Sequence, residues 1–522
     1  MIWDCVDWQM NQPGQPDAGK DMPSRTEVVV IGGGGSGLAA AIAAATGGAD
    51  VVLLEKNPAL GGTTARSIGS ITATRTPHQD RLGIIDSPQE HYRDMELFAR
   101  HVSRPDNDAL RRLLTDNVPE TFRWLSSLGV EFFGPVEEPP HKKPRMHNVL
   151  PNSRAYIFHL ERRARHLGVR ILTNARARRL LVGAGKVAGV EFDQPDKPGQ
   201  VVHASRGVVL ASGDYAANPD MKRALISDAV ARTEPVNPTS TGDGQRMAIE
   251  LGAKIINGDL FGGGARFAPP AKPSWISRLP PSTWLMRPAN VALRLAPLSM
   301  VRRFIMGFLT TVMVPSHELF DAGAILVNKD GERFADETAA MIFELAYQPD
   351  GVAYILFDGA VAEKISKWPY YISTAPGIAY AYLADYEKNR PDLVHRAETL
   401  DKLAPLIGAN PAKLIETVER YNLSNETGLS TLPARKQRPE LRSEPFYALG
   451  PVKNYISFTD GGLAINERLE VLDSQGDPIP GLYAAGSVGQ GGLLLKGHGH
   501  HIGWAFTSGR LAGSYAASRN ET

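Results

Sequence analysis

The chain has 522 residues, of which 43% are hydrophobic and 22% are charged, and its formal net charge is +1. This near-balance gives nucleic acid no electrostatic attraction to the chain, so we expect no nucleic-acid partner. The single cysteine, Cys5, excludes an intrachain disulfide and a thiolate-rich metal site. No run of 18 apolar residues occurs, and the first residues lack a secretory pattern. A cytoplasmic enzyme of about two domains is expected.

A glycine-rich turn between two apolar runs is the first strong signal. Residues 28–31 (VVVI) predict a buried parallel strand, followed by GGGGSG at 32–37 and an alanine-rich helix that ends near Gly47. A second strand then ends at Glu55. This order of strand, G-x-G-x-x-G, helix, strand and acid predicts a dinucleotide site, with the pyrophosphate at the helix N-terminus and Glu55 on a ribose hydroxyl.

A second glycine loop follows at once, in the sequence NPALGGTTARSIGSI at 57–71, and favours FAD over NAD. With three later stretches, GVVLASGDYAANPDM (207–221), GAILVNKDGERFADE (323–337) and IPGLYAAGSVGQGG (479–492), the chain resembles the flavoprotein family of fumarate reductase, succinate dehydrogenase and 3-ketosteroid dehydrogenases. The resemblance runs from about residue 27 to residue 513, and the chain is most similar in type to the ketosteroid dehydrogenase-like branch.

The resemblance implies an α/β architecture with a Rossmann-like, glutathione reductase-type FAD-binding domain and an inserted α+β cap. We expect residues 24–240 and 450–522 to form the FAD-binding domain, residues 241–449 the cap, and residues 1–23 an N-terminal extension. Residues 110–129 show helical spacing and end on Gly129, so a helix is predicted there.

The resemblance also implies which residues hold the cofactor. Thr63 stands where covalent members carry the flavin on a histidine, so we expect FAD to be bound non-covalently. The expected FAD-binding residues are Gly32, Gly34, Gly35, Ser36, Gly37, Glu55, Lys56, Gly61, Gly62, Thr63, Thr64, Gly69, Ala211, Ser212, Gly213, Gly486, Ser487 and Gly503.

Fumarate and succinate are disfavoured as substrates by the residues at the expected substrate positions. Ala362 stands at the place of the family's relay arginine, Ser457 and Phe458 at its histidine pair, and Lys496 at its final substrate arginine. A buried dicarboxylate without several cationic partners carries a large desolvation cost. The ketosteroid dehydrogenase-like loop shape fits better, although Leu495 stands at the position of that branch's tyrosine.

The C-terminal loop LLLKGHGHHIGW, at 493–504, contains three of the 13 histidines. We expect Lys496 and the backbone amides of Gly497 and Gly499 to hold a substrate carbonyl, and His501 or His498 to move the proton on the adjacent carbon. Tyr371 and Tyr380 are competing candidates for that proton transfer, and Arg154 is a candidate for lining the substrate cleft. No metal is expected, because adjacent histidine side chains diverge and no nearby carboxylate after Asp477 completes a ligand shell.

Residues 262–316 contain no acidic residue but seven basic ones, together with two tryptophans and an apolar run. Three explanations stay open: packing within the chain or against a second subunit, a gate for a lipophilic substrate, and peripheral contact with a membrane.

The sequence therefore predicts an FAD-dependent dehydrogenase or reductase that acts on a CH–CH or C=C bond beside a carbonyl. The first hypothesis is desaturation of a hydrophobic, cyclic ketone, with an electron acceptor or donor that the sequence does not identify. The alternatives are a reductase of an enone or unsaturated carboxylate held by Lys496 and Arg154, and a non-catalytic flavin or electron-transfer protein.

Overall fold

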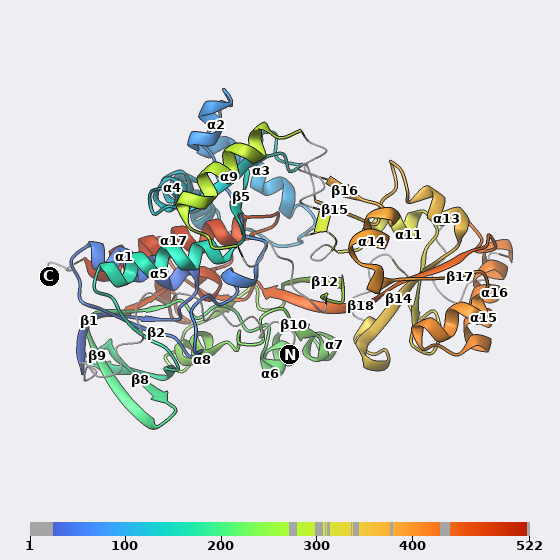
Figure 1. Cartoon of the computed structure of the whole chain (residues 1–522). Coiled ribbons are helices and arrows are strands. Elements are labelled where there is room, and N and C mark those ends of the chain that lie inside the picture. The colour runs from blue at the N-terminus through green and yellow to red at the C-terminus, as the bar shows by residue number, and fades with distance from the viewer. Residues whose placement is uncertain are drawn as a thin grey trace.

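The computed structural model describes residues 24–270, 279–297, 306–307, 310, 314–335, 337, 344–375, 379–427 and 439–518. The apolar run predicted at 304–314 lies mostly outside these residues. Figure 1 shows two bodies, a larger one with a sheet under a layer of helices and a smaller one joined to it by the long strand β18 (Phe446–Thr459).

The larger body is built on an eight-stranded sheet that starts from the predicted VVVI strand. Val28, Val29 and Val30 are fully buried, because β1 has parallel neighbours on both sides, with Val28 opposite Val51 and Gly207. The strand order is β20 (Glu470–Leu472), β21 (Pro478–Ala484), β9 (Lys197–Leu210), β1 (Arg25–Ile31), β2 (Val51–Leu54) and β6 (Arg170–Leu172), with β7 (Arg176–Gly183) and β8 (Lys186–Gln194) extending from β9.

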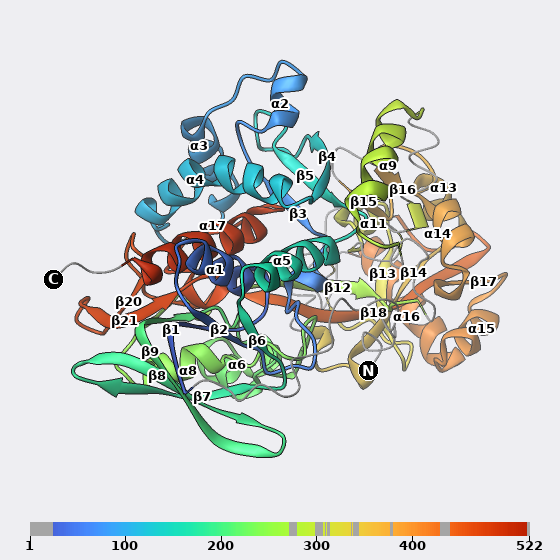
Figure 2. The same cartoon turned by 60° about the vertical axis from the view of Figure 1, so that its left-hand side comes forward.

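Helices cover one face of this sheet, as Figure 2 shows. The helix α1 (Gly35–Thr46) packs closely on α17 (His500–Ala517). Glycine at position 513 permits this approach, because a Cβ atom there would lie only 2.1 Å from the Ala40 carbonyl oxygen. The predicted helix at 110–129 is confirmed as α4 (Asp108–Ser127), and Gly129 follows it with a φ of 102°. The remaining helices of this body are α2 (Pro77–Arg81), α3 (Pro88–Ala99), α5 (Arg154–His166), α6 (Pro219–Leu225), α7 (Asp228–Arg232) and α8 (Asp243–Ile249).

A small antiparallel sheet lies beside α4 and α17, in the order β3 (Ser70–Thr72), β5 (Met146–Leu150) and β4 (Glu131–Val136). Residues 241–258, which the sequence assigned to the cap, lie with the larger body. Met247 and Ala248 belong to its hydrophobic core, and β11 (Ile255–Ile256) pairs with β19 (Gly462–Leu463).

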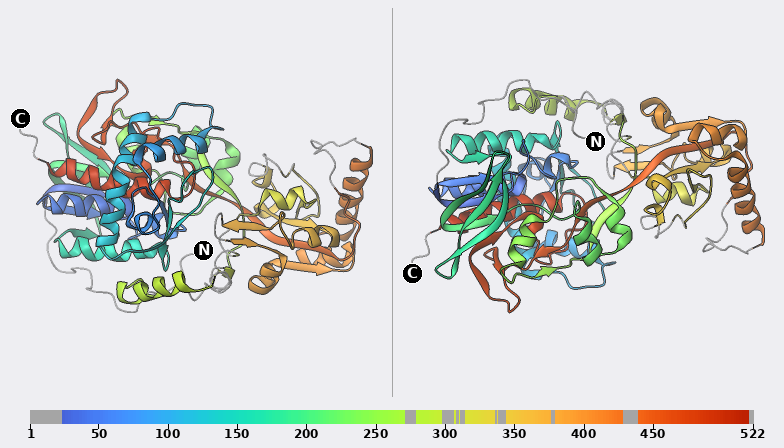
Figure 3. Two further views of the ribbon diagram at one scale, coloured as in Figure 1. Left: turned by 90° about the horizontal axis from the view of Figure 1, so that it is seen from above. Right: turned by 90° about the horizontal axis from the view of Figure 1, so that it is seen from below.

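The cap has its own hydrophobic core around the sheet of β10 (Glu234–Pro235), β18, β14 (Val352–Phe357) and β13 (Ile325–Asn328), in which β12 (Phe261–Phe267) and β17 (Val394–Ala397) also pair with β18. Its helices are α11 (His317–Asp321), α13 (Gly359–Lys364), α14 (Leu383–Asn389), α15 (Leu400–Leu403) and α16 (Pro411–Thr427), and a short hairpin is formed by β15 (Ser373–Ala375) and β16 (Ala379–Ala381). Views from above and below (Figure 3) show β18 crossing between the two bodies.

Candidate active site

The predicted glycine turn lines the wall of a cleft at the carboxyl ends of β1 and β2. The cleft is partly open, and about 780 Å³ of it, open solvent included, is not filled by atoms. Its lining includes Gly32, Gly34, Gly35, Ser36, Glu55, Lys56, Gly62, Thr63, Thr64, Ala211, Ser212, Gly213, Gly486 and Ser487, all of which the sequence predicted to bind FAD. Gly37, Gly61, Gly69 and Gly503 are not among the lining residues.

The geometry of the turn fits a pyrophosphate. Helix α1 begins after Gly34 without a side-chain cap, which leaves backbone N–H groups at its N-terminus for an anion. A Cβ atom on Gly34 would meet nothing closer than 3.9 Å, so this position is open for approach by a ligand. Gly37 acts differently, because its Cβ atom would lie 1.8 Å from the carbonyl oxygen of Gly32. Gly37 therefore permits strand–helix packing.

Glu55 lies at the carboxyl end of β2 with its side chain buried. One carboxylate oxygen accepts from the backbone N–H of Gly33 at 2.7 Å, and the other accepts from the N–H and the side-chain amide of Asn57 at 2.8 and 2.7 Å. These bonds fix the carboxylate in the cleft wall, where a ribose hydroxyl of a dinucleotide would be recognised.

The cleft also contains residues that sequence reasoning missed. The additional lining residues are Ile31, Gly33, Leu54, Asn57, Ala175, Arg176, Ala177, Asn237, Thr239, Ser240, Asp243 and Ala505. Asp243 bonds Lys56 at 2.7 Å and Arg176 at 3.2 Å. Burial raises the pKa of Asp243, but the charge and hydrogen bond of Lys56 outweigh it and hold the pKa well below its ordinary value. The sequence pattern that could have predicted Asp243 is TGDG at 241–244, in which an acidic residue flanked by glycines follows a polar run.

Thr63, at the position of the covalent histidine in related enzymes, lines the cleft and accepts a hydrogen bond of 2.9 Å from the amide of Asn237. The same amide donates to Ser240 at 3.0 Å. The second glycine loop is thereby tied to the segment before α8, which closes one side of the cleft.

The three histidines of the C-terminal loop do not form one group. His498 pairs with the buried carboxylate of Glu138 at 2.5 Å, and this hydrogen bond raises the pKa of His498. His500 is fully buried and points to His91, with 3.1 Å between their Nε2 atoms. His501 packs on Phe458, with 4.1 Å between ring centroids, and burial lowers its pKa to about 4.

Lys496 and His501 meet at a common carboxylate. Nζ of Lys496 lies 2.7 Å from Oδ2 of Asp460, and Nε2 of His501 lies 3.7 Å from Oδ1 of the same residue. Gln490 also donates to Oδ1, at 3.1 Å. Asp460 is fully buried, and Nε2 of His501 has no hydrogen-bond partner in the described part of the chain. The loop thus carries a lysine whose charge is balanced by Asp460 and a histidine, His501, whose Nε2 atom has no hydrogen-bond partner among the described residues.

The competing tyrosines lie in the cap, around the β15–β16 hairpin. Tyr371 donates to Glu318 at 2.8 Å, and burial, together with that carboxylate, raises the pKa of Tyr371 to about 12. The rings of Tyr371 and Tyr380 lie 4.8 Å apart, and Trp368 packs on Tyr380 at 5.0 Å. These residues form an aromatic cluster, and the β15–β16 hairpin, which contains Tyr380, lies at the edge of the cap that faces the larger body in Figure 1.

Arg154 begins α5, where burial and the nearby charge of Arg66 lower its pKa. Gly497 and Gly499 both have left-handed backbones, with φ of 86° and 81°, and a Cβ atom on Gly499 would lie 2.6 Å from the backbone nitrogen of Thr72.

Arg266 was missed by sequence reasoning. It donates to Ser457 at 2.9 Å, its Nε has no partner among described residues, and burial lowers its pKa.

Part of the acid-free segment forms α9 (Thr283–Leu295), which packs on β4. Arg287 pairs with Glu131 at 2.8 Å, and the amide of Asn290 donates to the Phe132 carbonyl at 2.9 Å. The side chains of Trp284 and Leu295 are 77% and 80% exposed. Among the described residues, no helix combines the length and the hydropathy needed to cross a bilayer.

Comparison with known proteins agrees with this geometry. The family model described as "FAD binding domain" matches residues 27–287 and 289–494. The chain belongs to the FAD binding domain family. It is therefore an FAD-binding oxidoreductase of the group that acts on CH–CH and C=C bonds, and the α/β fold class and the family resemblance predicted from the sequence are confirmed.

Relatives within this group include several reductases. A probable fumarate reductase of Shewanella frigidimarina is 28% identical and is aligned over 90% of this chain and 71% of its own length. An NADH:acrylate oxidoreductase of Vibrio harveyi is 27% identical over 90% of this chain, which spans only 48% of that protein. A urocanate reductase of Eggerthella lenta is 25% identical over 98% of this chain and 78% of its own length.

Two solved structures show the same architecture. The open conformation of a flavocytochrome c3 fumarate reductase superposes with a TM-score of 0.70 at 26% identity, covering 94% of this chain and 78% of its own. The 3-ketosteroid-delta4-(5alpha)-dehydrogenase of Rhodococcus jostii, in complex with 4-androstene-3,17-dione, gives a TM-score of 0.59 at 25% identity, covering 95% of this chain and 97% of its own.

Proposed function

We propose that the chain desaturates a hydrophobic, cyclic ketone at the carbons α and β to its carbonyl. The observation that carries this proposal is the Lys496–Asp460 pair, with 2.7 Å between charged atoms. A buried dicarboxylate needs several uncompensated cations. Here the lysine charge is already balanced by a fully buried aspartate, so the pair suits a neutral carbonyl oxygen, which needs a donor and no net charge.

Apolar and aromatic side chains near this pair support a hydrophobic substrate. Phe458 lies against His501 at the end of β18, next to Thr459 and Asp460. On the cap, Trp368 is 63% exposed and Tyr380 is 37% exposed, so aromatic surface is available there for a substrate. Ring-shaped ligands bury their faces favourably against such side chains.

The bound FAD would accept the hydride from the β carbon at its N5 atom. The chain's own residues perform the remaining tasks. Lys496 donates a hydrogen bond to the carbonyl oxygen and stabilises the enolate charge. Nε2 of His501, which has no partner among the described residues, takes the α proton. The electrons leave to an external acceptor, which regenerates the oxidised enzyme. FAD is held without a covalent link in this proposal.

The reverse reaction on an unsaturated carboxylate is the second candidate. Arg266 favours it, because its Nε is buried without a hydrogen-bond partner in the described part of the chain, and a carboxylate is a natural partner for a guanidinium. The acrylate and urocanate reductases among the relatives work on substrates of that class by their names. Lys496, Arg266 and Arg154 would then share the anion.

One anaerobic experiment separates these functions. The oxidised protein is mixed with saturated cyclic ketones, and the photoreduced protein with cyclic enones and unsaturated carboxylates, while the flavin absorbance is followed. Bleaching by a saturated ketone supports the dehydrogenase. Re-oxidation by an unsaturated carboxylate alone supports the reductase. A spectrum that no compound in the panel changes would contradict both functions and favour a non-catalytic electron-transfer role.

The surface of α9 suggests how a lipophilic substrate reaches the enzyme. Trp284, Val291 and Leu295 are exposed on a helix whose flanking segments contain only basic charges. Apolar side chains beside basic ones are the combination that binds the surface of an anionic membrane. We propose that α9 makes a peripheral contact with such a surface, in preference to a contact with a second copy of the chain, whose arginines would repel its own.

A further inference from the structure

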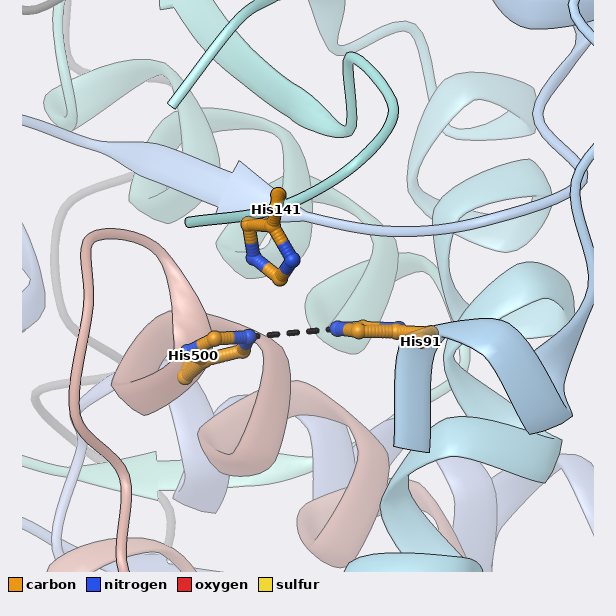
Figure 4. A group of neighbouring side chains, drawn as sticks. All are labelled: His91, His141 and His500. Atoms are coloured by element: carbon orange, nitrogen blue, oxygen red, sulfur yellow. Dashed lines mark hydrogen bonds between the residues drawn. The ribbon is translucent and has the colours of Figure 1, made fainter. Parts of the chain in front are cut away.

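Three histidines from distant parts of the sequence meet inside the larger body. His91 comes from α3, His141 from the loop between β4 and β5, and His500 begins α17. Their exposed fractions are 0%, 8% and 0%. One ring nitrogen of each lies within 4.8 Å of the other two, and Figure 4 shows the three rings gathered around a common space.

The hydrogen bonds of His500 leave one nitrogen ready to bind a cation. Its Nδ1 lies 2.5 Å from the backbone carbonyl of Lys496, and a carbonyl only accepts, so Nδ1 carries the proton. Nε2 therefore presents a lone pair, 3.1 Å from Nε2 of His91. Two imidazole ligands of one tetrahedral zinc ion lie roughly 3.3 Å apart. The two histidines already have nearly this spacing.

Two further nitrogens in the cluster are buried without a partner among the described residues. They are Nδ1 of His91 and Nε2 of His141. Buried polar atoms without partners are rare in folded proteins. An ion bound through the Nε2 atoms would give Nε2 of His141 a partner, whereas Nδ1 of His91 would stay without one. Nδ1 of His141 accepts from the Arg145 guanidinium at 3.0 Å, so the proton of the neutral ring lies on Nε2, and metal binding through Nε2 requires that proton to move to Nδ1.

The charge around the three rings is negative. The side chains of Asp86, Asp94 and Glu138 are at most 4% exposed, and the only buried cation among their described partners is Arg145. Three carboxylates against the Arg145 guanidinium leave a formal charge of −2, or −1 when His498, which pairs with Glu138, is protonated. Oε2 of Glu138 has no hydrogen-bond partner among the described residues. A divalent cation would balance this charge.

We propose that His91, His141 and His500 bind one divalent transition-metal ion, with Zn²⁺ as the ion that three imidazoles suit best. Coordination through Nε2 places the His141 proton on Nδ1, which lies 4.0 Å from Oδ2 of Asp94. A small turn of the ring away from Arg145 lets Asp94 accept that proton, which gives the carboxylate–histidine–metal arrangement common in zinc proteins.

The ion has a structural role and lies beyond the proposed redox chemistry. It joins α3, the loop before β5 and the start of α17, and so fixes the loop that carries Lys496 and His501. Binding to a preformed cluster in the folded state stabilises that state by mass action.

The test uses the purified FAD-containing protein after treatment with a chelator. Titration with Zn²⁺ by calorimetry is expected to show one site per chain, and the melting temperature is expected to rise with Zn²⁺. Co²⁺ in the same site is expected to give ligand-field bands to the red of the flavin absorbance. His91→Ala and His141→Ala are expected to weaken Zn²⁺ binding at least about 100-fold, and Asp94→Asn about 10- to 100-fold.

His203→Ala serves as the matched control, because His203 is exposed on β9 and outside the cluster. It is expected to bind Zn²⁺ like the wild-type chain. If His91→Ala loses FAD, His141→Gln replaces it, because glutamine keeps a polar side chain of similar length at this position. The proposal is overturned if the wild-type chain binds less than one Zn²⁺, or if the cluster variants bind as tightly as His203→Ala. Neither result depends on the substrate.

Discussion

Nζ of Lys496 lies 2.7 Å from Oδ2 of Asp460, and this pair joins the C-terminal loop to the end of β18. The aspartate side chain is fully buried and the lysine side chain is 17% exposed. Removing the lysine would leave a buried carboxylate whose remaining described contacts are Gln490 at 3.1 Å and His501 at 3.7 Å.

We expect Lys496→Met to lower the free energy of unfolding by about 3–5 kcal/mol, because an uncompensated buried charge remains. Asp460→Asn removes the charge and is expected to cost less. The double variant should recover most of the loss, which denaturant unfolding of the FAD-containing protein measures. Simple additivity of the two single changes would contradict the pairing.

Alanine at the second glycine of the fingerprint, Gly34, and at the third, Gly37, is expected to have different effects. Gly34→Ala should fold normally but bind FAD at least about 10-fold more weakly, because its Cβ enters space left for the ligand. Gly37→Ala should destabilise the FAD-free chain as well, by roughly 1–3 kcal/mol or more, since its Cβ lies 1.8 Å from the Gly32 carbonyl oxygen. Thermal unfolding with and without FAD separates the two. Equal melting temperatures for both FAD-free variants would contradict this assignment.

Asp243 predicts an acid sensitivity of the cofactor cleft. Its pKa is held below the ordinary value by Lys56 and Arg176, against the opposing effect of burial. A depressed pKa contributes stability that is present above about pH 4 and is lost as the pH falls through the folded-state pKa. Between about pH 6 and pH 3 the wild-type melting temperature should therefore fall more steeply than that of Asp243→Asn. Parallel curves would show that the pair contributes nothing to the pH dependence.

Changes on α9 test the surface contact apart from the fold. Trp284→Ser and Leu295→Ser alter side chains that are 77% and 80% exposed, so each should change the unfolding free energy by no more than about 0.5 kcal/mol. Both should lower co-sedimentation with anionic lipid vesicles. As a control, Val182→Ser alters another exposed apolar side chain, on β7, and should leave sedimentation unchanged. Equal sedimentation of all three variants with the wild-type chain would reject the membrane contact.

The FAD cleft was predictable because its signals are local. The buried run at 28–31, the glycine turn and Glu55 lie within about thirty residues, and each follows from backbone geometry. The histidine triplet was not predictable in the same way. Its members take their partners from Glu138, from His91 and His141, and from Asp460, which are far away in sequence. No spacing rule within residues 498–501 contains that information.

The packing of residues 241–258 on the larger body was not predictable for a related reason. Residues 241–258 follow the last family motif of the first segment, so composition offered no sign that α8 returns to the larger core. Asp243 was missed with it. Helix α4, by contrast, was placed to within two residues, because its periodicity and its terminal glycine are both local.

The strand β18 runs without interruption from the cap sheet to Thr459, one residue before Asp460. Its register with β14 begins at Tyr447 and Phe357 within the cap. One continuous strand therefore connects the cap sheet to Asp460, the buried carboxylate that bonds Lys496. Under the proposed function, a tilt of the cap would therefore move this carboxylate, and with it the lysine proposed to bind the substrate carbonyl.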